Sequence, residues 1–443
     1  MKIHLVSLGC ARNLVDSEGM LGQIKKAGFH ITDNPEHAHI IIVNTCSFIE
    51  SAVEESIDTI LEMARFKKSG KCRSLIVAGC LPERYGKDIA LELEEVDLFL
   101  GTGAFDRILE AVHGNLKDSN CILPDPDAIV SSPPDSPREW SLPYMAYIKI
   151  AEGCSRCCTY CIIPKLRGKQ KSRVPENILT EAKALIKSGT KELVLIAQET
   201  TEYGRDLPKD ANLTNLLKDI SNLTSNITED IWIRFLYGHP ESIDENLIKL
   251  ISERPNLCSY YDLPVQHASN SLLKKMGRNH SRGDLYRLFE KIRNIDPDAS
   301  LRTTAIVGFP GETDKDFQIL LDFVEDICFD NLGVFTYSDA DDLSSHHLSD
   351  HVPEKTAQER RNILMERQME ISSKNNEKYL DKTIRVLVEE SPEPDVFTGR
   401  TIFQAPEVDG MVYINSSNKL EIGNFTNVTI TDTLEYDLVG ETK

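Results

Sequence analysis

Short apolar runs alternate with amphipathic stretches along the first hundred residues. The pattern predicts strands over residues 3–6, 40–43 and 75–78 and helices over residues 18–27 and 53–64. Alternation of buried strands with helices is typical of a parallel sheet, because parallel neighbours need long crossover connections. We therefore predict an α/β fold and assign residues 1–123 to an N-terminal parallel α/β domain.

A second alternation of the same kind begins at residue 144. Its candidate strands cover residues 146–150, 193–196, 232–235, 260–263, 302–307 and 333–335. Helical stretches separate them, such as residues 176–187, which follow Pro175, and proline is favoured at the start of a helix. Six repeats are too many for a small open sheet and too few for an eight-unit barrel. They predict a partial (β/α)6 barrel over residues 144–375, with a site at its strand ends.

Prolines and turn residues mark the rest of the chain. Six prolines fall among Asp and Ser in residues 124–143, a composition that opposes both helix and strand, so we predict a linker there. A highly charged helix is expected over residues 358–379. The strands expected after it cover residues 384–388, 411–414 and 427–430. Gly and Pro turns separate these strands, which favours a small antiparallel β-barrel over residues 376–443.

The composition is that of an ordinary folded protein with several domains. Of 443 residues, 40% are hydrophobic and 27% are charged. No apolar run approaches the ~18 residues that would span a bilayer. The first residues soon become charged, unlike the apolar core of a signal peptide, so we expect a cytoplasmic protein without membrane contact.

Acidic residues outnumber basic ones by 70 to 50, which gives a net charge of −20. Such a field repels nucleic acid and anionic membranes and attracts basic partners, although acidity also serves solubility alone. Residues 378–443 hold 12 acidic and 6 basic residues, a poor surface for RNA. The charge therefore favours a basic protein substrate over tRNA, with a merely solvated surface as the alternative.

Three of the eleven cysteines form a compact metal-binding pattern. Cys154, Cys158 and Cys161 stand in C-x3-C-x2-C spacing directly after the first predicted barrel strand. Zinc usually takes four ligands from paired C-x2-C units, whereas three thiolates around a 4Fe-4S cluster leave one iron open. The spacing favours such a cluster over zinc or no metal, and we interpret Cys157 as a bystander.

A second set of cysteines is spread over the N-terminal domain. Cys10, Cys46 and Cys80 each follow a predicted strand and precede a predicted helix. The carboxyl ends of parallel strands share one edge of a sheet, so these thiols can converge on a second, incompletely ligated cluster. Three buried cysteines that act as small apolar side chains are the alternative. Four others are interpreted as ordinary, namely Cys72, Cys121, Cys258 and Cys328, and the histidines near strand ends as structural, namely His4, His239 and His267.

The cysteine frame at a barrel strand end resembles the radical S-adenosylmethionine (SAM) superfamily. Two further stretches are similar to it, Ala197-Gln198-Glu199 after the second strand and residues 304–312, which include Gly308-Phe309-Pro310-Gly311-Glu312. The resemblance implies a 4Fe-4S cluster at Cys154, Cys158 and Cys161 whose open iron binds SAM. The residues that it places at SAM are Gln198, Glu199, Gly308, Gly311 and Glu312.

Taken over its whole length, the chain resembles the methylthiotransferase family, and residues 7–18, 197–204 and 405–410 look like members that modify small-subunit ribosomal protein twelve. The resemblance implies that a β-carbon hydrogen of an aspartate is replaced by a methylthio group, with SAM as radical source and methyl donor. Sulfur would come from a second 4Fe-4S cluster at Cys10, Cys46 and Cys80. A TRAM-like terminal barrel and an electron donor such as flavodoxin or ferredoxin are also implied.

Two alternatives to this function stay open at the level of sequence. One is a tRNA methylthiotransferase with the same clusters, and the other is a non-catalytic protein that binds zinc or RNA. If the chain instead modifies a ribosomal protein, as the resemblance implies, its substrate is a basic ribosomal protein, either free or on the ribosomal subunit. No tRNA is then expected as a partner. No side chain beyond the cluster ligands is assigned a catalytic role.

Overall fold

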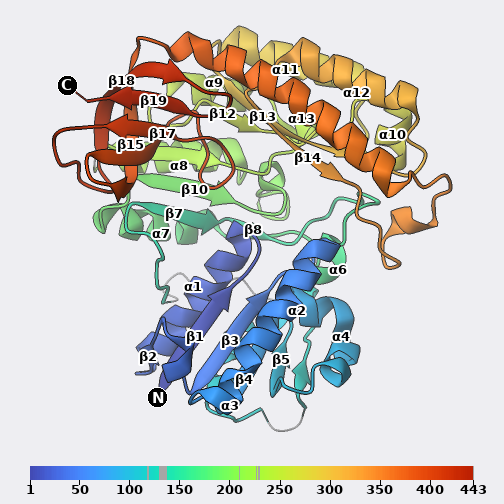
Figure 1. The fold of residues 1–443 in the computed structure, drawn as a ribbon, viewed down its shortest axis with the longest axis vertical. Helices are drawn as coiled ribbons and strands as arrows, with labels where there is room; N and C mark the ends of the chain where they lie inside the picture. Colours follow the sequence, from blue (N-terminus) through green and yellow to red (C-terminus); the bar gives the residue numbers. More distant parts are fainter. Residues whose placement is uncertain (117–118, 129–136, 209, 226, 228–229, 443) are drawn as a thin grey trace.

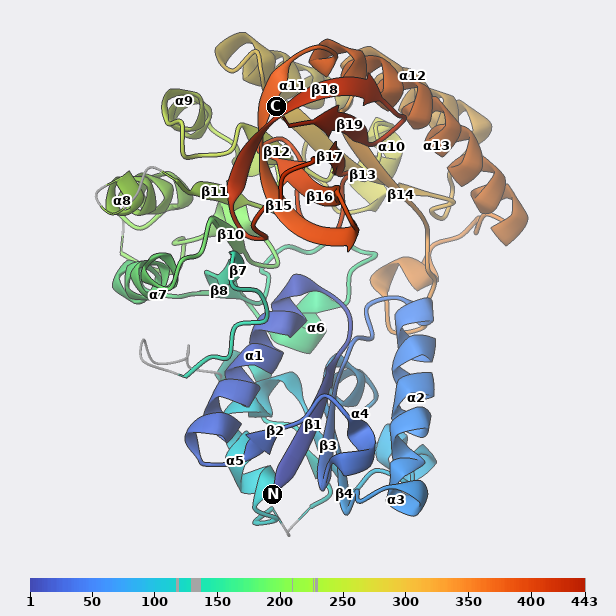
Figure 2. The same ribbon diagram turned by 60° about the vertical axis from the view of Figure 1, so that its left-hand side comes forward.

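The computed structural model describes residues 1–443 except 117–118, 129–136, 209, 226, 228–229 and 443. Two α/β regions stack along the long axis of the molecule, and a terminal β-barrel packs against the second of them (Figure 1). The short helix α6 (Ile163–Arg167) lies between the two α/β regions in both views (Figure 2).

A six-stranded parallel sheet forms the core of the N-terminal region, in the order β2-β1-β3-β4-β5-β6. Its strands are β1 (Lys2–Ser7), β2 (His30–Ile31), β3 (Ile40–Thr45), β4 (Ser74–Gly79), β5 (Leu98–Leu100) and β6 (Cys121–Ile122). The helices are α1 (Ala11–Lys26), α2 (Glu50–Ala64), α3 (Phe66–Ser69), α4 (Cys80–Glu92) and α5 (Ile108–Val112). All six residues of β3 are buried, because helices cover both faces of the sheet.

Helix α1 begins at Ala11, so the predicted start at residue 18 is wrong. Asn13 and Asp16 are buried on the same face of the helix as Met20 and Ile24, and Glu18 is buried on the opposite face. An apolar repeat therefore becomes visible only in the second half of the helix, although the helix starts well before it.

Six parallel strands form the central region, and all six agree with the predicted positions. They are β7 (Met145–Lys149), β10 (Glu192–Ile196), β11 (Trp232–Phe235), β12 (Tyr260–Asp262), β13 (Ser300–Val307) and β14 (Asn331–Thr336). The pairings are β11-β10-β7 and β12-β13-β14, and a bridge between Ile233 and Leu257 links the two groups. Among the described residues β7 does not pair with β14, so the barrel is partial and open, as predicted.

Helices alternate with these strands on the outside of the open barrel (Figure 1). They are α7 (Pro175–Lys187), α8 (Leu213–Ser225), α9 (Glu245–Glu253), α10 (Asn270–Lys275), α11 (Arg282–Ile295) and α12 (Asp314–Ile327). Pro175 begins α7, as the sequence predicts. Capping boxes at Ser281 and Thr313 fix the starts of α11 and α12, since each hydroxyl accepts from the backbone three residues on.

The terminal barrel follows α13 (Glu354–Asn376), which starts before the predicted residue 358. Its strands are β15 (Thr383–Glu393), β16 (Val396–Thr401), β17 (Val412–Asn415), β18 (Phe425–Thr433) and β19 (Leu438–Glu441). The ring closes in the order β15-β16-β17-β19-β18, and β17 pairs with β19 in parallel. The predicted small barrel is confirmed, and four of its five pairings are antiparallel. The β17–β19 pairing is parallel, because five strands cannot alternate direction all round a closed ring. Strands β16 and β19 were not predicted.

Where the structure describes it, the proline-rich segment contacts both the N-terminal and the central regions. Residues 129–136 of the predicted linker lie outside the described residues. Before them stands only a short 3-10 turn, Pro126–Ala128, and after them Arg138 pairs with Glu18 of α1 (2.5 Å) and Glu181 of α7 (2.6 Å). Within the described part of the chain, no helix is long and apolar enough to cross a membrane.

Candidate active site

Three cysteines of the N-terminal region lie at one edge of its sheet. Cys10 caps the start of α1 shortly after β1, Cys46 follows β3 directly, and Cys80 begins α4 directly after β4. The three strands are parallel neighbours, so their carboxyl ends share that edge. Cys80 is buried, whereas Cys10 and Cys46 are partly exposed.

The loops that carry the first two thiols approach each other closely at Gly9. Its φ of +84° favours glycine, and a Cβ there would lie 2.6 Å from the Cβ of Cys46. The side-chain amide of Asn13 donates to the carbonyl oxygens of Leu8 (2.8 Å) and Thr45 (3.0 Å). Asn13 therefore ties the loop before Cys10 to the end of the strand before Cys46.

The three thiols lie close enough to influence one another's ionisation. Burial, with smaller contributions from the charges of Cys80 and Cys10, raises the pKa of Cys46 to about 11. Burial also raises the pKa of Cys80, against the opposing charge of Arg167. At Cys10 the effect of burial is outweighed by the charge of Arg12, a backbone N–H and the charge of Arg167, which hold its pKa below the ordinary value. Arg12 and Arg167 thus favour the thiolate form of Cys10, whereas burial has the larger effect on the pKa of Cys46 and Cys80.

The second set of cysteines occupies the loop between β8 (Ala151–Glu152) and α6. The N–H of Cys154 donates to the carbonyl of Gly168 (3.0 Å), and the N–H of Cys161 donates to the carbonyl of Cys158 (3.1 Å). Burial raises the pKa of Cys154 to about 11 and that of Cys161 to about 12, and the Cys158 thiolate contributes to both. Cys157 is exposed. The fold thus brings each predicted triad together.

Arg156 anchors this cysteine loop to the strand ends of the barrel. Its guanidinium pairs with Glu199 (2.8 Å), Glu202 (2.8 Å) and Glu241 (2.9 Å). Glu199 and Glu202 follow β10, and Glu241 follows β11 in the turn Pro240–Ser242. One side chain therefore fixes the loop to two different strands.

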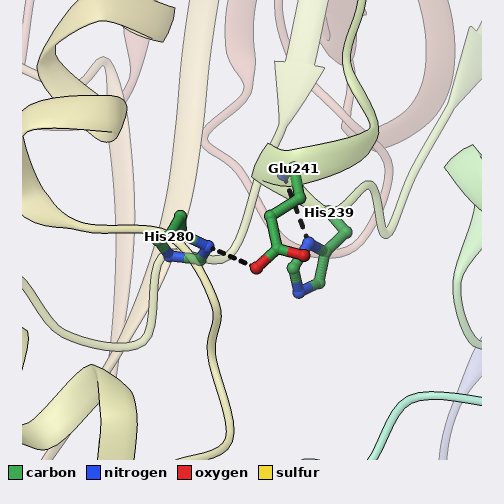
Figure 3. A group of neighbouring side chains, drawn as sticks. All are labelled: His239, Glu241 and His280. Atoms are coloured by element: carbon green, nitrogen blue, oxygen red, sulfur yellow. Dashed lines mark hydrogen bonds and ion pairs between the residues drawn. The ribbon is translucent and has the colours of Figure 1, made fainter.

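Glu241 also lies between two imidazole rings (Figure 3). The Nδ1 of His280 is 3.1 Å from its carboxylate, and the backbone N–H of Glu241 donates to the Nδ1 of His239 (3.3 Å). Burial, followed by the charges of Arg278 and Arg156, lowers the pKa of His239 well below its ordinary range. Two guanidinium charges and a carboxylate already paired with Arg156 disfavour a metal cation here. The group instead secures the anchor of the cysteine loop.

The residues predicted to lie at SAM follow two strands of the barrel. After β10, Gln198 donates to Glu152 (2.6 Å) and Glu199 pairs with Arg156. After β13 stand the other three, Gly308, Gly311 and Glu312. The contact of these five residues with SAM stays a prediction.

Packing gives Gly308 and Glu312 a role within the protein itself. The buried carboxylate of Glu312 accepts from the N–H of Gly308, pairs with Arg360 of α13 (3.1 Å) and lies 3.3 Å from His267. A Cβ at Gly308, whose φ is +76°, would lie 2.4 Å from the Cβ of Ala357 in α13. These contacts bind α13 to the end of β13.

A group of buried charges between the two cysteine sites was missed in the sequence. Arg167 at the end of α6 pairs with Asp16 of α1 (2.7 Å), and Lys149 pairs with both Asp16 and Glu152. A signal was available in α1, because Asn13 and Asp16 stand at helical spacing ahead of the buried apolar positions of the same helix. Polar side chains that continue an apolar face indicate a buried polar contact.

Three family models match successive parts of the chain. The uncharacterized protein family UPF0004 matches residues 2–101, the radical SAM superfamily matches residues 148–324, and the TRAM domain matches residues 382–442. Among solved structures, the radical SAM methyltransferase TsrM from Kitasatospora setae has a TM-score of 0.58 and 15% identity, and covers 76% of this chain and 74% of its own. The cobalamin-dependent SAM radical enzyme OxsB has a TM-score of 0.54 and 14% identity, and covers 84% of this chain and 56% of its own. Fold and cysteine loop together define a radical SAM enzyme, with an iron–sulfur cluster and SAM as cofactors.

Curated relatives narrow the class further. The ribosomal protein uS12 methylthiotransferase RimO of Desulfosudis oleivorans is 52% identical over 442 residues and covers 100% of both chains. The protein of the same name from Clostridioides difficile is 48% identical and covers 100% of this chain and 98% of its own. The chain belongs to the RimO family of methylthiotransferases.

Proposed function

We propose that this chain replaces a β-carbon hydrogen of an aspartate in ribosomal protein uS12 with a methylthio group. The observation that carries the proposal is the arrangement of two cysteine triads on either side of α6. Cys80 of the first triad packs in one buried cluster with Ile162 and Leu166, which follow Cys161 of the second. The two proposed cluster sites therefore lie close to each other.

Each triad fits an iron–sulfur cluster better than zinc. Three thiolates leave one iron of a 4Fe-4S cluster open, whereas a structural zinc ion closes its shell with four ligands. Guanidinium groups also offset the negative charge of a thiolate-ligated cluster, since Arg12 and Arg167 act on the first triad and Arg278 on the second. The proposed ligands are Cys10, Cys46 and Cys80 for an auxiliary cluster and Cys154, Cys158 and Cys161 for the radical SAM cluster.

The bound clusters and SAM supply the radical, sulfur and methyl chemistry that side-chain acids and bases cannot perform at an unactivated C–H bond. The chain's own residues bind and orient. Arg156 holds one cysteine loop, and Asn13 ties two others together. Beside SAM we place Gln198, Glu199, Gly308, Gly311 and Glu312. A flavodoxin or ferredoxin would supply electrons.

The charge on the terminal barrel favours a basic protein as the substrate. Three of its six basic residues are engaged in ion pairs, namely Lys378 with Asp330, Arg385 with Asp230, and Arg400 with Glu192 and Glu389. These pairs neutralise the positive charge that an RNA platform would need on its surface. The excess of acidic residues is left to attract a basic protein such as uS12. The barrel at 376–443 would then act with domains at 1–123 and 144–375, joined by the linker 124–143.

Metal analysis tests the two-cluster part of the proposal. Anaerobically purified protein should contain about eight iron and eight sulfide per chain, four of each for every cubane. Zinc in the absence of sulfide would overturn the proposal.

Mass spectrometry tests the substrate. In cells that lack the gene, uS12 should lose an adduct of about 46 Da, which is SCH3 in place of H, while tRNA stays unchanged. The purified protein should restore the adduct on uS12, supplied either free or within the small subunit. Loss of a tRNA methylthio group with uS12 unaffected would instead assign tRNA as the substrate.

A further inference from the structure

Arg167 belongs to the radical SAM region but reaches into the cysteine site of the other domain. Its side chain is 3% exposed and ends α6, close after Cys161. One terminal nitrogen, Nη2, lies 3.5 Å from the Sγ of Cys80 and donates to the Oδ1 of Asn13 (2.8 Å). The other, Nη1, donates to Asp16 (2.7 Å). The guanidinium therefore touches a proposed cluster ligand directly.

Through Asn13, the same guanidinium is connected to the backbone that carries the other two thiols of the triad. That side chain uses its oxygen to accept from Arg167 and its amide nitrogen to bind the carbonyls of Leu8 and Thr45. Those carbonyls stand beside Cys10 and Cys46. A planar guanidinium suits this arrangement, because its several N–H groups point in fixed directions.

We infer that Arg167 is a positioning residue of the auxiliary cluster, to whose Cys80 thiolate it donates a charge-assisted N–H···S hydrogen bond that raises the cluster's reduction potential. The inference rests on the proposed assignment of Cys10, Cys46 and Cys80 as ligands. Hydrogen bonds to cluster sulfurs and nearby positive charge favour the more negative, reduced state. A residue of the radical SAM domain thus sets the reduction potential of the cluster in the N-terminal domain. That potential then depends on correct docking of the two domains.

The test uses the full-length chain with Cys154, Cys158 and Cys161 all replaced by Ala, which leaves the auxiliary site as the proposed cluster site. Arg167→Met and Arg167→Lys are made in this background. Each protein is reconstituted anaerobically, analysed for iron and sulfide, and titrated with dithionite while electron paramagnetic resonance (EPR) is recorded. The matched control is Arg138→Met, which removes the ion pairs with Glu18 of α1 and Glu181 of α7 and touches no proposed cluster ligand.

The expected result is a lower midpoint potential in Arg167→Met. The equilibrium constant of one-electron reduction should fall about tenfold, which corresponds to 59 mV. The midpoint potential of Arg167→Lys should lie between those of Arg167→Met and the background protein, because lysine keeps the charge but not the several N–H donors of a guanidinium. The midpoint potential of Arg138→Met should match that of the background protein. An unchanged potential in Arg167→Met, or an equal shift in Arg138→Met, would overturn the inference.

Failure of the proposed function would look different. Absence of iron and sulfide from the background protein itself would remove the auxiliary cluster and not merely the role of Arg167. If Arg167→Met is unstable, Arg167→Met/Asp16→Asn removes both charges of the buried pair and keeps the charge balance. Loss of the cluster from both variants, with an unchanged circular dichroism spectrum, supports the positioning role.

Discussion

Arg400 of the terminal barrel pairs with Glu192 of β10 at 2.6 Å, and both side chains are buried. Arg234 of β11 pairs with the other oxygen of the same carboxylate at 2.9 Å. One carboxylate therefore joins two strands of the open barrel to β16 of the terminal barrel. Trp232 of β11 also packs against Phe425 of β18 at this boundary, with ring centroids 4.6 Å apart and ring planes tilted by 58°.

Glu192→Gln should loosen the terminal barrel from the radical SAM domain. The change leaves two buried guanidinium groups without their shared charge, and breaking a buried pair costs about 3–5 kcal/mol. Urea unfolding followed by tryptophan fluorescence should report it, because Trp232 lies at the boundary. Glu245→Gln is the control, since solvent screens its exposed pair with Lys249 and the loss of that pair should leave the midpoint unchanged. Equal midpoints for the two variants would contradict the expectation.

The same carboxylate predicts how stability depends on pH. Burial alone would raise the pKa of Glu192, but Arg400 and Arg234 outweigh it and hold the pKa below the ordinary value. The stability that ionised Glu192 contributes is therefore complete at pH values above the pKa of Glu in the unfolded chain, about 4.3. It is lost as the pH falls through the lower pKa that Glu192 has in the folded protein. The stability difference between the parent and Glu192→Gln should be constant between about pH 6 and 8 and shrink below about 4. A difference that grows on acidification would refute this.

Single cysteine variants should separate the two clusters. Cys46→Ala and Cys158→Ala should each lose about half of the iron and sulfide, since each removes one of three ligands from a different cubane. Cys157→Ala should retain all of it, because this exposed thiol stands outside the triad. EPR of the reduced proteins should show a different remaining signal in the first two variants. An identical spectrum for Cys46→Ala and the parent protein would refute the auxiliary site.

The packing of Gly308 predicts a stability effect that is independent of SAM. Gly308→Ala places a Cβ in the left-handed region and 2.4 Å from the Cβ of Ala357, so it should lower the free energy of unfolding by about 1–3 kcal/mol. Adding Ala357→Gly should recover part of this loss by removing the clash. The cycle of single and double variants is measured by denaturant unfolding without SAM. If Gly308→Ala weakens SAM binding and leaves stability unchanged, the glycine serves the cofactor instead.

Strand positions were predictable because parallel strands covered on both faces contain continuous apolar runs, such as residues 40–43 of β3 and 193–196 of β10. Convergence of Cys10, Cys46 and Cys80 was also predictable, since strand order fixes one edge. The polar positions of α1 could have indicated a buried polar contact, but its partners were not predictable, because the residues that pair with Arg167 and Arg400 come from distant segments. Strand β19 was not predicted, for a related reason. It has four residues, and its pairing with β17 depends on closure of the barrel.

Arg156 offers a test of how the radical SAM loop is held. Removing its guanidinium in Arg156→Met leaves Glu199 and Glu202 buried without that partner, and the loop loses its attachment to two strand ends. We expect the cluster at Cys154, Cys158 and Cys161 to lose iron to a chelator about tenfold faster, which a loss of 1.4 kcal/mol would produce. The measurement is the decay of the EPR signal in a background with Cys10, Cys46 and Cys80 replaced by Ala.

Arg205→Met is the matched control for that experiment. Arg205 pairs with the same Glu202 at 2.6 Å, but its side chain is 71% exposed, so solvent screens the pair and its loss should leave the decay unchanged. The decay of the EPR signal in Arg156→Lys should be faster than in Arg205→Met and slower than in Arg156→Met, because one ammonium group cannot reach three carboxylates at once. Equal decay in the Arg156 and Arg205 variants would show that the loop holds its cluster without this anchor.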